Sequence, residues 1–171
     1  MSLLKGYAHK LGDRICTDVH VSARSHPIGT TREQLIANMF HDIDPHFSKK
    51  IRKGDFIVAG DYFGTRSTFD DSIDIMKAAG IAAVIAKQFG HLFFRCAVNG
   101  GLLAITANTD EIEEGDLLMI DLTKSIIIDE TLGLAIAFDP LPEFLLNMVH
   151  DGGVFNHIRK HGDYVSAPQA K

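Results

Sequence analysis

Cysteine is scarce in this chain of 171 residues, which has two cysteines and nine histidines. Cys16 and Cys96 have neither CxxC nor Cys/His spacing, so we expect no disulfide framework and no structural metal site. An iron–sulfur cluster usually takes roughly three or four thiolates, and this chain alone cannot supply them. The histidines lack HExxH and HxH spacing. We therefore predict that this chain binds no metal and no cofactor of its own.

Long apolar runs and basic stripes are missing as well. No stretch approaches the ~20 apolar residues that cross a membrane, and the N-terminus lacks an apolar core of the signal-peptide kind. The net charge is −5 and no basic stripe stands out, which argues against a nucleic-acid-binding surface. The nucleotide-binding fingerprints GxxxxGK[ST] and GxGxxG are also absent. We expect a cytoplasmic protein without membrane or nucleic-acid partners.

What is present is typical of a folded α/β protein. Hydrophobic residues make up 46% of the chain and charged residues 23%, and the length fits one domain. Between residues 55 and 105, apolar runs alternate with segments of helical spacing, which predicts a βαβαβ core. The expected strands of this core are 55–60, 81–86 and 102–105, and the expected helices are 68–79 and 91–98.

Further elements are expected on both sides of this core. A strand at 3–11 and a helix over 31–41 precede it, and a strand-rich stretch with tight turns follows it. The later strands are expected at 116–123, 125–128 and 134–138, and two C-terminal helices at 142–149 and 154–160. We predict a single domain over residues 1–161, followed by a disordered tail at 162–171.

The turn at residues 60–67 is the most informative segment of the chain. It follows an apolar strand and precedes a helix that is expected to start at Thr68, so the Ser67 hydroxyl is predicted at the mouth of that helix. Unpaired N–H groups and the positive end of the helix dipole suit an anionic ligand there. The alternative is that Ser67 is only an N-cap, with Asp70 completing a capping-box-like pair.

Several short motifs occur in a shared order and spacing along nearly the whole chain. They are residues 12–18, 23–24, 53–60, 63–67, 83–86 and 99–103, and Gly152 with Gly153 near the end. Together they resemble the small subunit of 3-isopropylmalate dehydratase, the swivelling domain of the aconitase superfamily. The resemblance implies an α/β fold of the aconitase swivel type, a three-layer β/β/α domain in which a β-rich part is appended to the βαβαβ core.

The resemblance also implies a function. It indicates the small subunit of a hydro-lyase that is active only as a heterodimer with a large subunit, which carries a [4Fe–4S] cluster. In this family a serine of the small subunit removes a proton next to a carboxylate while the hydroxyl leaves on iron. Water then adds back with the positions exchanged. The implied substrate is a hydroxy di- or tricarboxylate such as 3-isopropylmalate, from leucine biosynthesis.

The family's functional residues map onto specific positions of this chain. Ser67 matches the catalytic serine, and Arg66 is the cation nearest to it. Arg24 matches an arginine that contacts a substrate carboxylate, and Gly64 is expected to let the backbone approach the substrate. The other expected substrate contacts are Thr65, Thr68, Ser25 and His26.

The serine motif departs from the family pattern. The family usually has Gly-Ser-Ser-Arg-Glu at positions 66–70, where this chain has Arg-Ser-Thr-Phe-Asp. Phe69 cannot make the charge-assisted, two-pronged contact by which an arginine holds a carboxylate. Either Arg66 reaches into the site from a shifted backbone and serves a variant substrate, or the standard activity has been lost. In the second case the chain is a non-catalytic carboxylate-binding or regulatory module that retains the swivel fold.

A second departure concerns the loop after Arg24. The family commonly continues with Tyr-Leu, whereas residues 25–29 of this chain form a smaller and more polar loop. This favours a substrate whose side group differs from the isobutyl-like group of isopropylmalate, such as a methylated malate. His26 either hydrogen-bonds a polar group of the substrate or is a solvated loop residue.

Overall fold

The computed structural model describes residues 3–67 and 70–162. Seven strands within these ranges form one sheet, in the order β4-β3-β2-β1-β5-β6-β7. The strands are β1 (Leu3–Lys10), β2 (Phe56–Ala59), β3 (Ala83–Ala86), β4 (Leu103–Thr106), β5 (Leu117–Asp121), β6 (Ile126–Asp129) and β7 (Leu134–Ala137). Strands β1 to β4 pair in parallel, whereas β5, β6 and β7 extend the sheet with antiparallel pairs. The sheet therefore has a parallel half and an antiparallel half.

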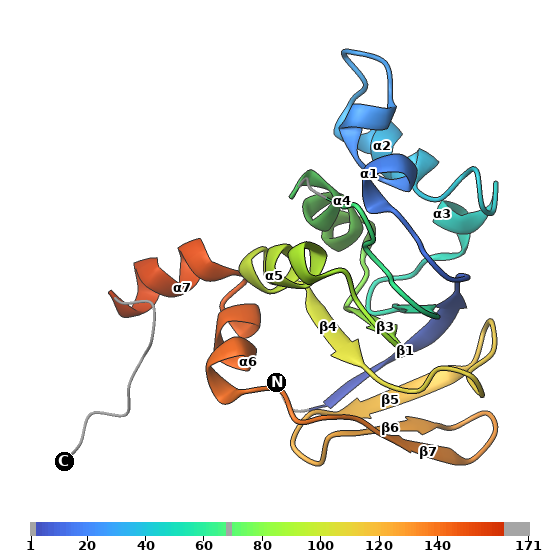
Figure 1. The fold of residues 1–171 in the computed structure, drawn as a ribbon, viewed down its shortest axis with the longest axis vertical. Helices are drawn as coiled ribbons and strands as arrows, with labels where there is room; N and C mark the ends of the chain where they lie inside the picture. Colours follow the sequence, from blue (N-terminus) through green and yellow to red (C-terminus); the bar gives the residue numbers. More distant parts are fainter. Residues whose placement is uncertain (1–2, 68–69, 163–171) are drawn as a thin grey trace.

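Most helices of the described residues lie on one side of the parallel half (Figure 1). The helices are α1 (Thr17–His20), η1 (Ala23–Ser25, a 3₁₀ helix), α2 (Arg32–Asn38), α3 (Phe47–Lys50), α4 (Asp71–Ala79), α5 (His91–Asn99), α6 (Glu143–His150) and α7 (Val154–His161). Helices α4 and α5 connect β2 to β3 and β3 to β4, as the βαβαβ pattern predicts. No helix in the ranges 3–67 and 70–162 is long and apolar enough to cross a membrane.

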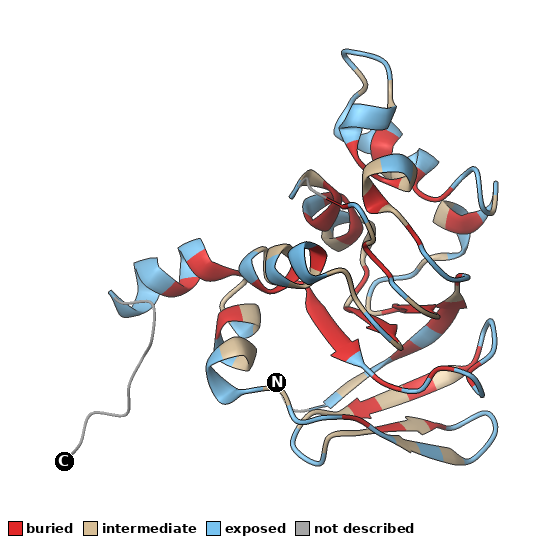
Figure 2. Cartoon of the chain, in the orientation of Figure 1, coloured by how far each residue is buried: buried red, intermediate tan, exposed pale blue. Residues whose placement is uncertain are grey.

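The strands of the parallel half are buried on both faces, which explains why they are continuous apolar runs. In β2, Ile57 belongs to a hydrophobic core shared with α4 and α5, where it joins Met76 and Phe93. Its neighbour Val58 belongs to a second core, shared with Ile120 and other residues of the antiparallel half, because successive strand residues point to opposite faces. The parallel strands are accordingly coloured as buried along most of their length in Figure 2, with one core on each face of the sheet. The predicted β/β/α layering is confirmed.

Strand β1 joins the two halves of the sheet. It pairs in parallel with β2 on one side and antiparallel with β5 on the other. Buried Asp55 fastens it to the start of β2, because its carboxylate accepts the Tyr7 N–H at 3.0 Å and contacts His9 Nε2 at 2.8 Å. The two β layers are thus one curled sheet, a continuity that the sequence pattern did not predict.

The expected strands and long helices of the sequence analysis are all present, with ends that shift by a few residues. The difference that matters for the site is at α4, which begins at Asp71 with Asp70 in the N-cap position. The prediction that Ser67 caps this helix is therefore wrong. The chain is still turning there, since Gly64 and Arg66 both have a left-handed backbone conformation. The predicted tail falls largely on residues 163–171, outside the described ranges, and it stays a prediction together with the domain boundary.

Candidate active site

Ser67 lies in the loop between β2 and α4, at the edge of the sheet where the parallel strands end. Two neighbouring loops hold this segment in place: the Gly64 N–H donates to Ile15 O at 2.8 Å, and the Phe63 N–H donates to Gln88 O at 2.9 Å. Phe63 also forms an isolated parallel bridge with Phe89. The loops that follow β1, β2 and β3 therefore meet at this edge, which is where open α/β sheets bind ligands.

The Ser67 hydroxyl accepts two hydrogen bonds from one residue. The Thr17 N–H donates to Ser67 Oγ at 2.9 Å, and the Thr17 hydroxyl donates to the same oxygen at 2.8 Å. Ser72 Oγ in turn donates to Thr17 Oγ1 at 3.2 Å. Because donors aimed at an oxygen favour its ionised form, this arrangement lowers the cost of removing the Ser67 proton.

Ser67 is buried in this chain, with 4% of its surface exposed. The sequence analysis placed its hydroxyl at the mouth of the helix that follows, next to the unpaired N–H groups there. That placement is wrong within the part of the chain that the structure describes, where the N–H that reaches Ser67 Oγ belongs to Thr17, at the start of α1. The correction follows from the delayed start of α4, which leaves Ser67 in the loop.

The turn that carries Arg24 is attached to the first residue of α4. One carboxylate oxygen of Asp71 accepts hydrogen bonds from the Ser22 hydroxyl at 2.9 Å and from the Ala23 N–H at 2.8 Å. The other oxygen of Asp71 is buried and has no hydrogen-bond partner among the described residues. Asp71 thus holds the turn with Arg24 next to the start of α4, and Arg24 is exposed there.

Arg66 is exposed and has φ of 57°. A left-handed conformation costs an L-residue roughly 1–2 kcal/mol, whereas glycine adopts it freely. Gly64, with φ of 76°, is buried, and a Cβ on it would lie 2.2 Å from Phe93 Cβ. The requirement for glycine at position 64 is therefore set by packing against α5, and its predicted contact with the substrate stays a prediction. Thr65 is half-buried, and Thr68 and Phe69 lie outside the described residues.

Ser25 and His26 bond mainly to their own turn. The Ser25 hydroxyl donates to Ser22 O at 2.9 Å, and His26 Nδ1 lies 3.1 Å from the same carbonyl oxygen. Ser25 is exposed and His26 is half-buried. These contacts shape the loop after Arg24, while its predicted contact with a substrate is not tested by them.

The thiol of Cys96 lies near acidic groups of the same region. Burial raises its pKa to about 11, with further contributions from the carboxylates of Asp70 and Asp18. The group is therefore a protonated thiol at neutral pH, and it is a poor metal ligand in that form. Cys16, at the N-cap of α1, is also a free cysteine.

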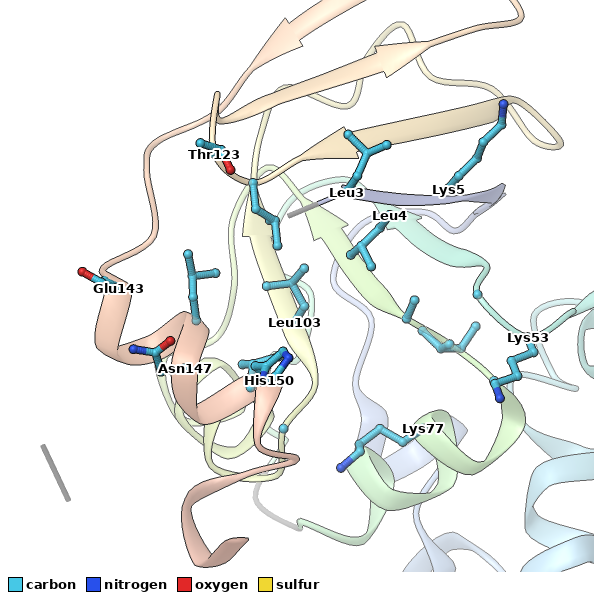
Figure 3. Close-up of a pocket in the computed structure, with 18 residues that line it drawn as sticks. Leu3, Leu4, Lys5, Lys53, Lys77, Leu103, Thr123, Glu143, Asn147 and His150 are labelled. Carbon is cyan, nitrogen blue, oxygen red and sulfur yellow. The ribbon is translucent and has the colours of Figure 1, made fainter. Parts of the chain in front are cut away.

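A separate hollow lies at the opposite edge of the sheet. It has a volume of about 990 Å³, and its lining includes Leu4, Lys53, Ile81, Leu103 and Leu146. Leu4 and Leu103 lie on β1 and β4, as Figure 3 shows. Lys53 and Ile81 precede β2 and β3, and Leu146 lies on α6. Ser67 follows the end of β2, so this hollow is separate from the candidate site.

The chain is similar in sequence to several known proteins. No model of a protein family matches the chain, but individual relatives do. A 3-isopropylmalate dehydratase small subunit 2 from Archaeoglobus fulgidus is 42% identical over 158 residues, which are 92% of this chain and 96% of the relative. A methanogen homoaconitase small subunit from Methanocaldococcus jannaschii is 38% identical over 160 residues, 92% of either chain.

A solved structure agrees with these relatives. The crystal structure of 3-isopropylmalate dehydratase from Methanocaldococcus jannaschii matches with a TM-score of 0.86 at 37% identity, over 94% of this chain and 95% of that one. The chain belongs to the family of 3-isopropylmalate dehydratase small subunits. The resemblance found in the sequence is thereby confirmed, and with it the class of protein, a small subunit of an aconitase-type hydro-lyase.

Membership in this family clarifies the departure at position 66. The glycine usual in these small subunits suits the left-handed backbone that Arg66 adopts. The loop therefore keeps a conformation suited to glycine although the side chain has changed.

Two residues of the site were missed by the sequence analysis. Thr17 supplies both hydrogen bonds to Ser67, and Asp71 holds the turn with Arg24. Both partners are about 50 positions away along the chain, so no local spacing could reveal them. Thr17 does lie within the motif at residues 12–18, and that motif was the one feature of the sequence that could have pointed to it.

Proposed function

We propose that this chain is the small subunit of a two-chain hydro-lyase that isomerises a hydroxy di- or tricarboxylate by removing and re-adding water. The relatives support this class of substrate, because they include 3-isopropylmalate dehydratase and homoaconitase small subunits. The first substrates to test are 3-isopropylmalate, which would place the enzyme in leucine biosynthesis, and a methylated malate, which suits the smaller loop after Arg24.

The observation that carries the proposal is the pair of hydrogen bonds from Thr17 to Ser67 Oγ. In the proposed reaction the Ser67 hydroxyl, once ionised, removes a proton from the carbon next to a substrate carboxylate. Serine is a weak base in water, and two donors on its oxygen stabilise the ionised form. Burial of Ser67 by itself opposes ionisation, because the charged form loses hydration, but it also makes the two hydrogen bonds stronger than they would be in water.

Burial of Ser67 also bears on the partner. A substrate can reach the hydroxyl only when the loops around it separate. We infer that docking of the large subunit moves the turn at Ala23–Ser25, which Asp71 attaches to the start of α4. The same movement positions Arg24, and Arg66 from the neighbouring loop, to bind the substrate carboxylates. This chain would accordingly be inactive alone.

The residues of this chain do not fit a [4Fe–4S] cluster. It has two cysteines, and the raised pKa of Cys96, about 11, keeps that thiol protonated. In this proposal the cluster belongs to the large subunit, where it would supply a Lewis acid for the departing hydroxyl. Both cysteines of the chain are free, which is typical of proteins in a reducing compartment. We therefore place the enzyme in the cytoplasm.

The test is a turnover assay of the complex. The chain would be produced with its large subunit under anaerobic conditions and assayed with 3-isopropylmalate, methylated malates and a hydroxytricarboxylate. Ser67→Ala is expected to lower kcat by at least about 100-fold, because a general base contributes this much or more. Ser48→Ala is the matched control: its hydroxyl donates to Ala37 O, far along the chain from the site.

Two outcomes would contradict the proposal. Full turnover by the Ser67→Ala complex on the best substrate would remove Ser67 from the mechanism. Carboxylate binding by the intact complex without turnover of any substrate would instead identify the chain as a non-catalytic module.

A further inference from the structure

The C-terminal segment holds a cluster of metal-binding side chains that plays no part in the proposed reaction. Helices α6 and α7 pack against α5, where Met148 and Val154 join Val98 in a small hydrophobic core. Asp151 lies between the two helices, and His157 and His161 lie on α7. His157 is almost fully buried, with 1% of its surface exposed.

Three donor atoms of this cluster face one another. Asp151 Oδ2 lies 2.7 Å from His157 Nδ1 and 2.9 Å from His161 Nε2. The three donor atoms lie within 4.8 Å of one another. His157 and His161 are four positions apart, so they share one face of α7, and their ring centroids are 4.6 Å apart. A ligand bound there could contact all three side chains at once.

We propose that Asp151, His157 and His161 bind one divalent transition-metal ion of the zinc class. Two imidazole nitrogens and one carboxylate oxygen are a donor set that zinc uses, with a water as the fourth ligand. Metal–ligand bonds of about 2.0–2.2 Å place neighbouring donors of a tetrahedral site about 3.3 Å apart. The two contacts of Asp151 Oδ2, 2.7 and 2.9 Å, need to open by about half an ångström to admit the ion, and the two imidazole nitrogens lie within 4.8 Å of each other.

The surroundings supply support and access. Lys160 Nζ donates to Asp151 Oδ1 at 2.6 Å, which leaves Oδ2 for the metal and orients the carboxylate, as outer groups of metal sites do. A hollow of about 160 Å³ is lined by His150, Asp151, Lys160 and His161. It offers a path from solvent and room for the water ligand. The positive charge of Lys160 weakens the site, so we expect an affinity below that of structural zinc sites.

The cluster could instead be a clamp of hydrogen bonds that only fastens α7, and the experiment has to separate the two roles. The full chain without a histidine tag would be stripped with a chelator and titrated with Zn²⁺ by calorimetry. Co²⁺ would be added in parallel as a spectroscopic probe. We expect one site per chain, a visible Co²⁺ absorption of tetrahedral intensity, and a higher Tm with Zn²⁺.

Variants locate the site. His161→Ala removes a ligand whose side chain is 35% exposed, at the last residue of α7, so folding should be preserved. It is expected to weaken Zn²⁺ binding at least about tenfold and to abolish the Co²⁺ absorption and the shift in Tm. His41→Ala is the control, because His41 is exposed and lies far along the chain.

Lys160→Ala keeps all three ligands and is expected to retain the site. The proposal would be overturned if Zn²⁺ bound equally well to the native chain and to the His161→Ala variant, or if the native chain did not bind Zn²⁺. The cluster would then be only a set of hydrogen bonds that fastens α7. Neither result depends on turnover by the complex, so the metal site and the proposed reaction are tested separately.

Discussion

At the scale of single residues, two buried carboxyl groups lie together at the antiparallel half of the sheet. Asp116, just before β5, accepts the Glu113 N–H at 2.7 Å, and Asp129 is fully buried at the end of β6. Burial raises the pKa of Asp116, and the neighbouring carboxyl of Asp129 raises it further. The folded chain therefore holds a proton there that the unfolded chain releases more readily.

The direction of this pKa shift predicts how pH affects stability. A raised pKa in the folded state means that the contribution of Asp116 is favourable below its unfolded pKa, about 4, and is lost as pH rises through the folded value. Asp116→Asn keeps an oxygen for the Glu113 N–H and offers an N–H₂ group to Asp129. We expect the variant to gain about 1 kcal/mol over the native chain at pH 8, with the gain shrinking toward pH 4.

Urea unfolding at a series of pH values measures this difference. Asp139→Asn is the control, because Asp139 is exposed and its replacement should be neutral at every pH. A loss of stability in Asp116→Asn that is the same at pH 4 and pH 8 would contradict the raised pKa assigned to Asp116.

At the scale of elements, the loop between β2 and α4 depends on its contact with α5. Gly64 lies against Phe93, which is buried in the core, and a Cβ at this position would overlap with the Phe93 side chain. Gly64→Ala adds this overlap to the cost of a left-handed alanine. We expect a loss of about 3 kcal/mol in the free energy of unfolding, from roughly 1–2 kcal/mol of strain and a similar packing cost.

Gly133→Ala separates the two contributions. Gly133 has φ of 72°, and nothing lies within 4 Å of a Cβ built on it. The control therefore carries the strain alone and should lose about 1 kcal/mol. Equal losses in the two variants, measured by thermal or urea unfolding, would show that contact with α5 does not hold the loop.

At the scale of the whole molecule, two glycine-containing backbone segments cross in close contact and join the C-terminal helices to the α/β core. A Cβ on Gly101 would lie 2.4 Å from the carbonyl carbon of Gly152. A Cβ on Gly153 would lie 2.5 Å from Asn99 O. The backbone before β4 and the backbone between α6 and α7 therefore approach as closely as glycine allows.

This crossing predicts a distinct effect for one substitution. Gly101→Ala is expected to push the segment between α6 and α7 away from the core and to cost about 3 kcal/mol, since overlapping backbone cannot move aside as a side chain can. Limited proteolysis should then cut near residues 150–162 earlier than in the native chain. Gly115→Ala, with φ of 86° and open space around its Cβ, should leave the cutting rate unchanged. If both variants are cut alike, the crossing is not what holds α6 and α7.

Local sequence patterns were sufficient to predict most of the helices and strands. The alternation of apolar runs and helical spacing over residues 55–105 predicts β2, α4, β3, α5 and β4, because burial on two faces or on one stripe leaves a direct trace in residue order. The shared order and spacing of the short motifs, from residues 12–18 to Gly152 and Gly153, indicated the family as well. The short helices α1 and α3, with four residues each, leave no such periodic trace.

The sequence by itself determined the layers, the family and the positions that carry the serine and the arginines, since each of these depends on residues close together in the chain. Only the tertiary structure decided what the serine contacts. Thr17 meets Ser67, Asp71 meets the turn at Ala23, and Asp151 meets two histidines of α7. The physical reason is that hydrogen bonds and metal ligation require distances of a few ångströms. Chain folding sets such distances between residues whose spacing in the sequence carries no sign of them.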